Sequence, residues 1–221
     1  FLGPEVILGH GLYTGGHSQI AYPFAGDLDA LVETGTNVAH CPLVFGRRGV
    51  TLESAHRYRA HGVNLAIGTD TYPQDIVGEL QFASLFSKVT DHDFESMQTR
   101  EVFNAATLGG AKALGRDDLG RLAPGAKADI VIADFSRLRI GPFLDPIKAL
   151  IHCGNGEVVD TVIVAGHEVV KGGHMVAWDE AELLASVRAS TDTAWGHFAD
   201  YHPGNEPIGE VYPSAFKAWE G

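Results

Sequence analysis

The chain has 221 residues, of which 45% are hydrophobic and 20% charged, and its formal net charge at pH 7 is −12. This composition is typical of a folded globular protein with room for one domain and a smaller second one. The excess of acidic residues argues against nucleic-acid or membrane partners, since both need a basic face. No apolar run approaches the roughly 20 residues of a membrane span.

The two cysteines, Cys41 and Cys153, lie far apart and form no CxxC pair. They therefore indicate neither a disulfide framework nor a cysteine zinc site, and we expect a reducing, cytoplasmic setting. The first residues carry no basic start followed by a long apolar core. Because the chain begins without Met, a few residues before a predicted strand, we expect it to be part of something longer.

Three short apolar runs in the first 70 residues each lead to a polar side chain: "VILGH" to His10, "NVAHC" to His40 and "NLAIGTD" to Asp70. Helical spacing over residues 27–35 and 54–62 separates them, and each helical segment stops at a glycine, the expected helix stop. Further helices are predicted over residues 75–89 and 99–115. The order is therefore strand, helix, strand, helix, strand, helix.

Apolar strands that alternate with helices predict a parallel sheet with right-handed crossovers, and hence an α/β fold. Functional groups in such sheets gather at the carboxyl ends of the strands. His10, His40 and Asp70 all fall at that end, and neighbouring strands lie only about 4.8 Å apart. We therefore expect the three side chains to converge on one small ligand.

The pattern changes after residue 115. A β-branched run over residues 129–135 and a hairpin over 158–176 predict a small β module without helices. A helix follows over residues 179–202, and the tail from Pro203 is expected to be extended. We expect domains at residues 1–115, 116–176 and 177–221. The candidate apolar face of the last helix is formed by Leu183, Leu184, Val187 and Trp195.

Imidazole and carboxylate are both good ligands for zinc, so His10, His40 and Asp70 form a plausible metal site. Ordinary structural roles compete with this interpretation. Asp70 could cap the next helix, His40 could be a buried histidine bonded to a carbonyl, and the glycines flanking His10 could mark a tight bend. A Cys41 thiolate paired with His40 is disfavoured, because adjacent strand residues point to opposite faces.

Other candidates are weaker. Arg47 and Arg48 follow the second strand and could pair with an anionic or carbonyl-bearing substrate, although a basic loop before a helix explains them equally well. His17, in the loop after the first strand, could reach the site. The remaining histidines are expected at the solvated surface.

Several motifs, taken in order, resemble the second half of the amidohydrolase superfamily: "ILGHGLY", "VAHCPLVFGRRG", "LAIGTDTYPQD", "TREVFNAATLGGAKALG", "GRLAPGAKADIVIAD" and "VDTVIVAGHEVVKGG". The resemblance covers the chain to about residue 176. The most similar branch contains metal-dependent deaminases and chlorohydrolases that act on nitrogen heterocycles. "VFGRR" stands where many relatives have an Asn-Leu pair, so no single relative fixes the substrate.

The resemblance implies the C-terminal part, strands 6 to 8, of a (β/α)8 TIM-like barrel, followed by a small β-sandwich module and a C-terminal helix. It implies that His10 and Asp70 are catalytic, with Asp70 also a metal ligand, and that His40 faces the substrate. Arg47 remains the further candidate for substrate binding. The implied cofactor is a divalent metal, with zinc expected and iron as the alternative.

The other family ligands, an HxH pair and a histidine followed by a glutamate, are not found, since the eleven histidines contain no HxH. A half barrel cannot close, which leaves strand edges open. We therefore expect the N-terminal half of the barrel as a partner of this chain. A small molecule is the expected substrate, and a homo-oligomer is an open alternative. A binuclear amide or urea hydrolase and a non-catalytic half-barrel subunit are the competing functions.

Overall fold

The computed structural model describes residues 1–216. Contact clustering divides the chain into two compact units, one comprising Phe1–Gly173 and the other beginning at His174. Within residues 1–216, every helix is too short or too polar to cross a membrane. Each unit is described by itself.

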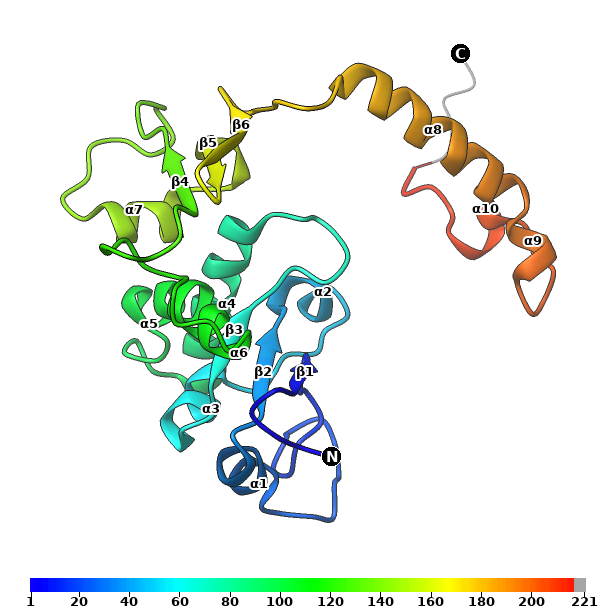
Figure 1. The fold of residues 1–221 in the computed structure, drawn as a ribbon. Helices are drawn as coiled ribbons and strands as arrows, with labels where there is room; N and C mark the ends of the chain where they lie inside the picture. The colour runs from blue at the N-terminus through cyan, green and yellow to red at the C-terminus, as the bar shows by residue number, and fades with distance from the viewer. Residues whose placement is uncertain (217–221) are drawn as a thin grey trace. The chain divides into compact units, whose positions relative to one another are not determined.

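A three-stranded parallel sheet lies at the centre of the first unit (Figure 1). Its strands are β1 (Ile7–Gly9), β2 (Asn37–His40) and β3 (Leu65–Ile67), in the order β1-β2-β3. Both pairings are parallel, as the alternating pattern predicts. The carboxyl ends of all three strands therefore meet at one edge of the sheet.

The crossover helices α1 (Asp27–Thr34) and α3 (Ala55–His61) end where the sequence predicts. Gly35 and Gly62 follow them in the left-handed conformation, with φ of 71° and 106°. The short helix α2 (Pro42–Gly46) was not predicted. It begins directly after β2, at a proline whose fixed φ suits the first turn of a helix.

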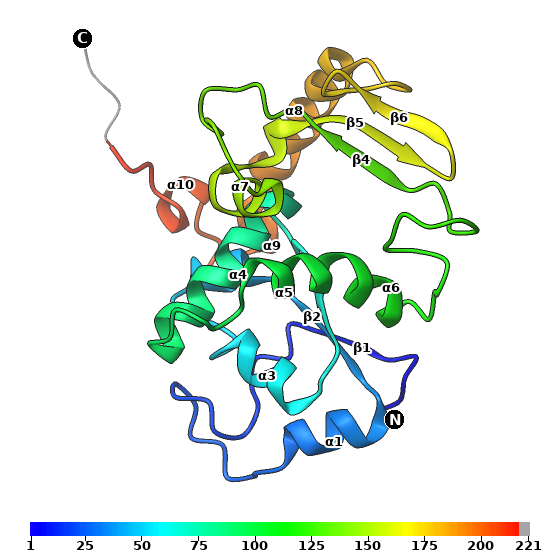
Figure 2. The ribbon, with the colours of Figure 1, turned by 90° about the vertical axis from the view of Figure 1, so that its left-hand side faces the viewer.

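After β3 the chain forms α4 (Ile76–Asp91), capped by Asp75, whose carboxylate accepts a hydrogen bond from the Gly78 amide at 3.0 Å. The helix predicted over residues 99–115 is observed as α5 (Thr99–Asn104), a π-helical turn η1 (Ala105–Gly109) and α6 (Gly110–Ala113). Figure 2 shows these three segments as one continuous run. Side chains from the sheet and the helices form one buried core, which includes Leu12, Leu28, Leu31, Val38, Leu52, Tyr58, Leu65, Leu80, Met97 and Val102.

The predicted β module contains an antiparallel arrangement of β4 (Ile130–Ala133), β5 (Val159–Val164) and β6 (His167–Lys171). The expectation that it lacks helices is wrong, because α7 (Pro146–Cys153) and the 3-10 turn η2 (Gly156–Val158) lie between β4 and β5.

The start of α7 has a physical reason. Asp145 accepts hydrogen bonds from the amides of Ile147 and Lys148 at 2.9 and 3.1 Å. Proline follows it at the first helical position, so "DPIKAL" carries a regular helix start that the β-rich surroundings obscured.

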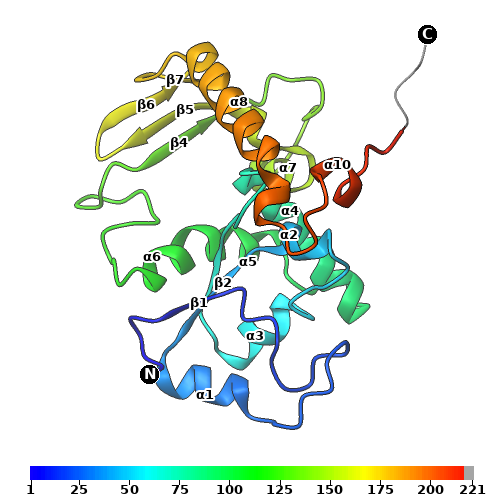
Figure 3. The same cartoon turned by 90° about the vertical axis from the view of Figure 1, so that its right-hand side faces the viewer.

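The second unit contains β7 (His174–Met175), α8 (Glu180–Gly196), α9 (Phe198–Tyr201) and α10 (Ile208–Val211). The long helix α8 is plainly visible in Figure 3. The single helix predicted over residues 179–202 is interrupted at His197, and α10 lies in the tail that was expected to be extended.

We predict opposite effects of alanine at two adjacent helical glycines. A Cβ on Gly109 would lie 2.0 Å from the carbonyl oxygen of Leu65, whereas a Cβ on Gly110 meets nothing within 4 Å. Gly109→Ala should therefore lower the free energy of unfolding by about 1–3 kcal/mol or more through overpacking. Gly110→Ala should raise it by about 0.5–1 kcal/mol through helix propensity.

Urea denaturation of the two variants measures both changes. Equal stability of the two variants would show that the helical run does not approach β3 as closely as described.

Candidate functional site

His10 and Asp70 meet at the carboxyl edge of the sheet. The His10 Nε2 atom lies 3.5 Å from the Asp70 Oδ2 atom, and each side chain is 30% exposed. Both residues adopt the left-handed backbone conformation, with φ of 69° at His10 and 57° at Asp70. Non-glycine residues adopt this conformation uncommonly, and such residues cluster at functional sites. The two strand ends thus present an imidazole and a carboxylate to the same space.

The imidazole of His10 is held by its surroundings. The Phe45 ring packs edge-on against it, with the ring centres 4.5 Å apart. The hydroxyl of buried Tyr58 donates a hydrogen bond to the carbonyl of Gly11 at 2.7 Å, which fixes the backbone just after His10. The His10 Nδ1 atom is buried and has no partner within residues 1–216. A buried polar atom without a partner is where a ligand or solvent is expected.

His40 is buried, with 3% of its surface exposed. Burial, together with a smaller effect of the nearby His10, lowers the pKa of His40 to about 3. His40 is therefore a neutral imidazole at physiological pH. Its contact with substrate stays a prediction.

Arg47 joins two loops at the carboxyl edge. Its Nη1 atom donates a hydrogen bond to the carbonyl of Tyr72 at 3.1 Å, and its guanidinium lies 4.8 Å from the centre of the Tyr72 ring. Arg47 follows β2 and Tyr72 follows Asp70, so this contact ties the loop of one strand to the loop of the next. Its contact with substrate also stays a prediction.

The structure gives His17 a structural role. Its Nε2 atom lies 2.8 Å from the carbonyl of Thr51, and its Nδ1 atom accepts a hydrogen bond from the amide of Gln19 at 3.2 Å. Both ring nitrogens are therefore occupied by backbone, and the hypothesis that His17 serves the site has no support here.

Cys41 remains a thiol at neutral pH. Burial raises its pKa to about 11, and the charges of Glu79 and Asp70 act in the same direction. A thiolate nucleophile at this position is thus disfavoured on electrostatic grounds as well as by strand geometry.

Glu79, in the first turn of α4, is a residue that the sequence interpretation missed. It is completely buried, and its Oε2 atom accepts a hydrogen bond from the Leu43 amide at 3.0 Å, while its Oε1 atom is buried without a partner within residues 1–216. Burial raises the pKa of Glu79 from 4.5 to about 7, an effect that the Leu43 hydrogen bond opposes. A glutamate early in a helix is ordinarily solvated, so its sequence position gave no signal.

The donors brought together here are too few to hold a catalytic metal ion by themselves. Within residues 1–216, no group of three or more His, Cys, Asp and Glu side chains is arranged to hold a metal. His10, His40 and Asp70 do not form such a group within these residues, since His40 is buried whereas the side chains of the other two are partly exposed. Their convergence on one ligand stays a prediction. Carboxylate and imidazole suit zinc, but a catalytic zinc ion takes three protein ligands.

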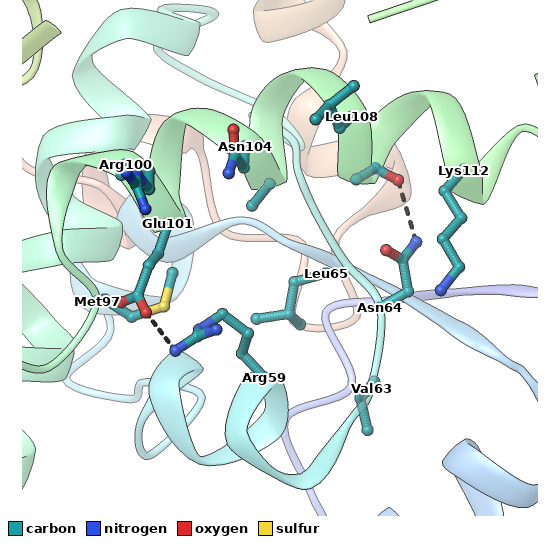
Figure 4. A pocket seen from close by; sticks show the side chains of 12 residues that line it. Arg59, Val63, Asn64, Leu65, Met97, Arg100, Glu101, Asn104, Leu108 and Lys112 are labelled. Carbon is teal, nitrogen blue, oxygen red and sulfur yellow. Dashed lines mark hydrogen bonds and ion pairs between the residues drawn. The ribbon is translucent and has the colours of Figure 1, made fainter. Parts of the chain in front are cut away.

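Three cavities of about 420 to 440 Å³ lie on the first unit. One of about 440 Å³ opens beside His10 and is lined in part by Tyr13, Tyr22 and Phe45. A second, of about 420 Å³, lies between α3 and the α5–α6 run (Figure 4). The third, also of about 420 Å³, lies around the end of α6 and the loop that follows it.

The cavity in Figure 4 is bordered by an ion pair between Arg59 and Glu101 and by a hydrogen bond of 3.1 Å from Asn64 Nδ2 to the carbonyl of Gly109. It touches the amino end of β3, whereas Asp70 follows the carboxyl end. We therefore take the His10 end of the sheet as the candidate site.

Known proteins are similar to this chain in sequence and in fold. A sequence model described as the amidohydrolase family matches residues 1–169. A 5-methylthioadenosine/S-adenosylhomocysteine deaminase of Teredinibacter turnerae is 34% identical over 171 residues, covering 73% of this chain and 38% of the relative. A 5'-deoxyadenosine deaminase of Methanosarcina mazei is 28% identical, covering 87% of this chain and 43% of the relative.

Solved structures agree with the sequence matches. A zinc-bound adenosine deaminase from Xanthomonas campestris superposes with a TM-score of 0.78 and 27% identity, over 87% of this chain and 43% of that one. An atrazine chlorohydrolase variant from Arthrobacter aurescens, complexed with zinc and atraton, superposes with a TM-score of 0.73 and 25% identity, over 85% and 41%. The chain thus spans about two fifths of the length of these proteins.

We predict that Glu79→Gln changes the pH dependence of stability. The pKa of Glu79 is higher in the folded than in the unfolded chain, so the folded state holds the proton more tightly. This contribution to stability is complete below pH 4.5 and is lost as pH rises through about 7. Between pH 6 and pH 8 the wild type should lose about 1 kcal/mol relative to Glu79→Gln.

Urea denaturation of both proteins at the two pH values measures this difference. A stability difference that does not change with pH would contradict the buried, protonated carboxyl.

Proposed function

This chain belongs to the amidohydrolase family, and we propose from that membership that it forms part of a metal-dependent hydrolase acting on carbon–nitrogen bonds other than peptide bonds. The observation that carries the proposal is the approach of His10 and Asp70 to 3.5 Å at the carboxyl edge of a parallel sheet. A histidine and an aspartate side chain in this place offer both a metal ligand and a group that can orient water.

The proposed substrate class is a nitrogen heterocycle that loses an amine, ammonia or halide to water. The similar proteins are named as deaminases of 5-methylthioadenosine, S-adenosylhomocysteine, 5'-deoxyadenosine and adenosine, and as a chlorohydrolase of atrazine. Free thiols at Cys41 and Cys153 agree with our placement of the enzyme in the cytoplasm.

We further propose that β1, β2 and β3 are the sixth, seventh and eighth strands of a (β/α)8 barrel whose N-terminal half lies outside this chain. Strands β1 and β3 are the two edges of the sheet within residues 1–216. Open parallel edges are costly, since parallel sheets are normally closed or covered. Missing strands on both sides would pair these edges and bring further metal ligands to the site.

Asp70 is the proposed metal ligand in this chain. Its carboxylate is partly exposed beyond the end of β3, and zinc accepts such an oxygen together with imidazole nitrogens. A bound zinc ion supplies a water molecule acidic enough to be present as hydroxide at neutral pH.

The protein residues would then handle protons and orientation. The Oδ2 atom of Asp70 would receive the water proton and release it toward the leaving group, while the facing Nε2 atom of His10 would orient the attacking oxygen. His40 and Arg47 would contact the substrate. The contact of Arg47 with the loop that follows Asp70 supports this role.

We predict that Asp70→Asn in the complete protein lowers kcat by at least about a thousandfold, because a proton carrier is lost together with a ligand charge. Metal content should fall in parallel. The control is Asp75→Asn, since asparagine also caps helices and should keep the hydrogen bond to Gly78. Activity and metal that survive in Asp70→Asn would contradict the assignment.

The function itself is tested by incubating the complete protein with zinc and a panel of aminopurine nucleosides and chlorinated triazines, and by measuring released ammonia and chloride. We expect turnover of one of these classes. Metal binding without release of either product from any substrate would favour a non-catalytic role.

A further inference from the structure

We propose that Glu79 is a positioning residue of the active site, which holds helix α2 in place from helix α4. The proposal rests on the proposed function for its catalytic consequence, but its structural basis is independent of that function. Within residues 1–216, no hydrogen bond or ion pair joins Glu79 to His10 or Asp70, so Glu79 would act through α2.

The link between Glu79 and α2 is a single buried hydrogen bond. Helix α2 has no side-chain cap of its own, since Cys41 at its N-cap supplies none. The Oε2 atom of Glu79 instead accepts a hydrogen bond of 3.0 Å from the amide of Leu43, in the first turn of α2. A carboxylate at a helix amino end both satisfies a free amide and interacts favourably with the helix dipole.

This hydrogen bond joins the loops of two strands. Leu43 lies three positions after His40 at the end of β2, and Glu79 lies nine positions after Asp70 at the end of β3. Close packing supports the same link: a Cβ on Gly46 of α2 would lie 2.5 Å from the ring of Phe86 on α4. The two helices therefore meet at a distance that admits no side chain at this point.

Helix α2 in turn carries the contacts that shape the site. Phe45, its fourth residue, packs against the ring of His10 at 4.5 Å between centres. Arg47, at its C-cap, contacts the carbonyl and ring of Tyr72. A shift of α2 would therefore move the packing around His10 and the loop after Asp70 together.

Stability alone gives little reason for a carboxylate at this position. Glu79 is fully buried, one of its oxygens has no partner within residues 1–216, and no positive charge forms an ion pair with it there. Burying a carboxyl group without a full set of partners costs free energy, whereas an apolar side chain of similar size does not carry that cost. An apolar residue, however, could not accept the hydrogen bond that the Leu43 amide donates to Glu79.

The test compares Glu79→Gln with Glu79→Met in the complete protein. The two side chains are uncharged and similar in size, but only glutamine can accept the Leu43 hydrogen bond. We expect Glu79→Gln to keep kcat within about threefold of the wild type, and Glu79→Met to lower kcat at least about tenfold with KM changed less than about threefold, as for a small misplacement of catalytic groups.

A second readout needs no turnover. In protein labelled with ¹³C in the histidine rings, the Cε1–H resonance of His10, assigned by its loss in His10→Asn, senses the ring of Phe45. It should shift in Glu79→Met and stay near the wild-type position in Glu79→Gln. If the complete protein has no hydrolase activity, the proposed function fails while this resonance still decides the role of Glu79.

Ser87→Ala is the matched control for lost stability. Ser87 is also buried on α4 and accepts a backbone amide, that of Ala55 at 3.1 Å, away from α2. Ser87→Ala should lower the melting temperature without moving kcat or the His10 resonance. An unchanged His10 resonance in Glu79→Met would overturn the proposal, as would equal effects of Glu79→Met and Glu79→Gln on kcat.

Discussion

The parallel pairing of three short strands is the constraint on which the site depends. Because β1, β2 and β3 run in the same direction, the residues that follow them share one edge of the sheet. The backbone then turns into the left-handed region at His10 and at Asp70, which brings an imidazole and a carboxylate within 3.5 Å. The proposed chemistry depends on the closeness of these two side chains.

The same sheet supports the proposal that the chain carries only part of a site. Its edge strands have open sides within residues 1–216, and the partly exposed donors at the carboxyl edge are fewer than a catalytic zinc ion takes. The chain also spans about two fifths of the related deaminases and chlorohydrolase. Incomplete pairing and incomplete ligation both agree with the proposal that a second half of the barrel lies outside this chain.

Much of the first unit could be predicted from the sequence, because local signals agree with the fold. The apolar runs, the glycine stops after α1 and α3 and the positions of His10 and Asp70 all reflect short-range patterns. What could not be predicted depends on contacts between distant segments. Burial of Glu79 against Leu43, and the use of His17 by Thr51, arise only when separate loops pack together. The proposed roles of His40 and Arg47 toward substrate stay predictions.

The most direct test of the account is a zinc titration, by calorimetry, of this chain alone and of the complete protein. The account predicts about one zinc per complete protein, with affinity at least about a hundredfold weaker for this chain, because most of the ligands lie elsewhere. One tightly bound zinc ion on the isolated chain would contradict it, since His10 and Asp70 would then belong to a site complete in itself.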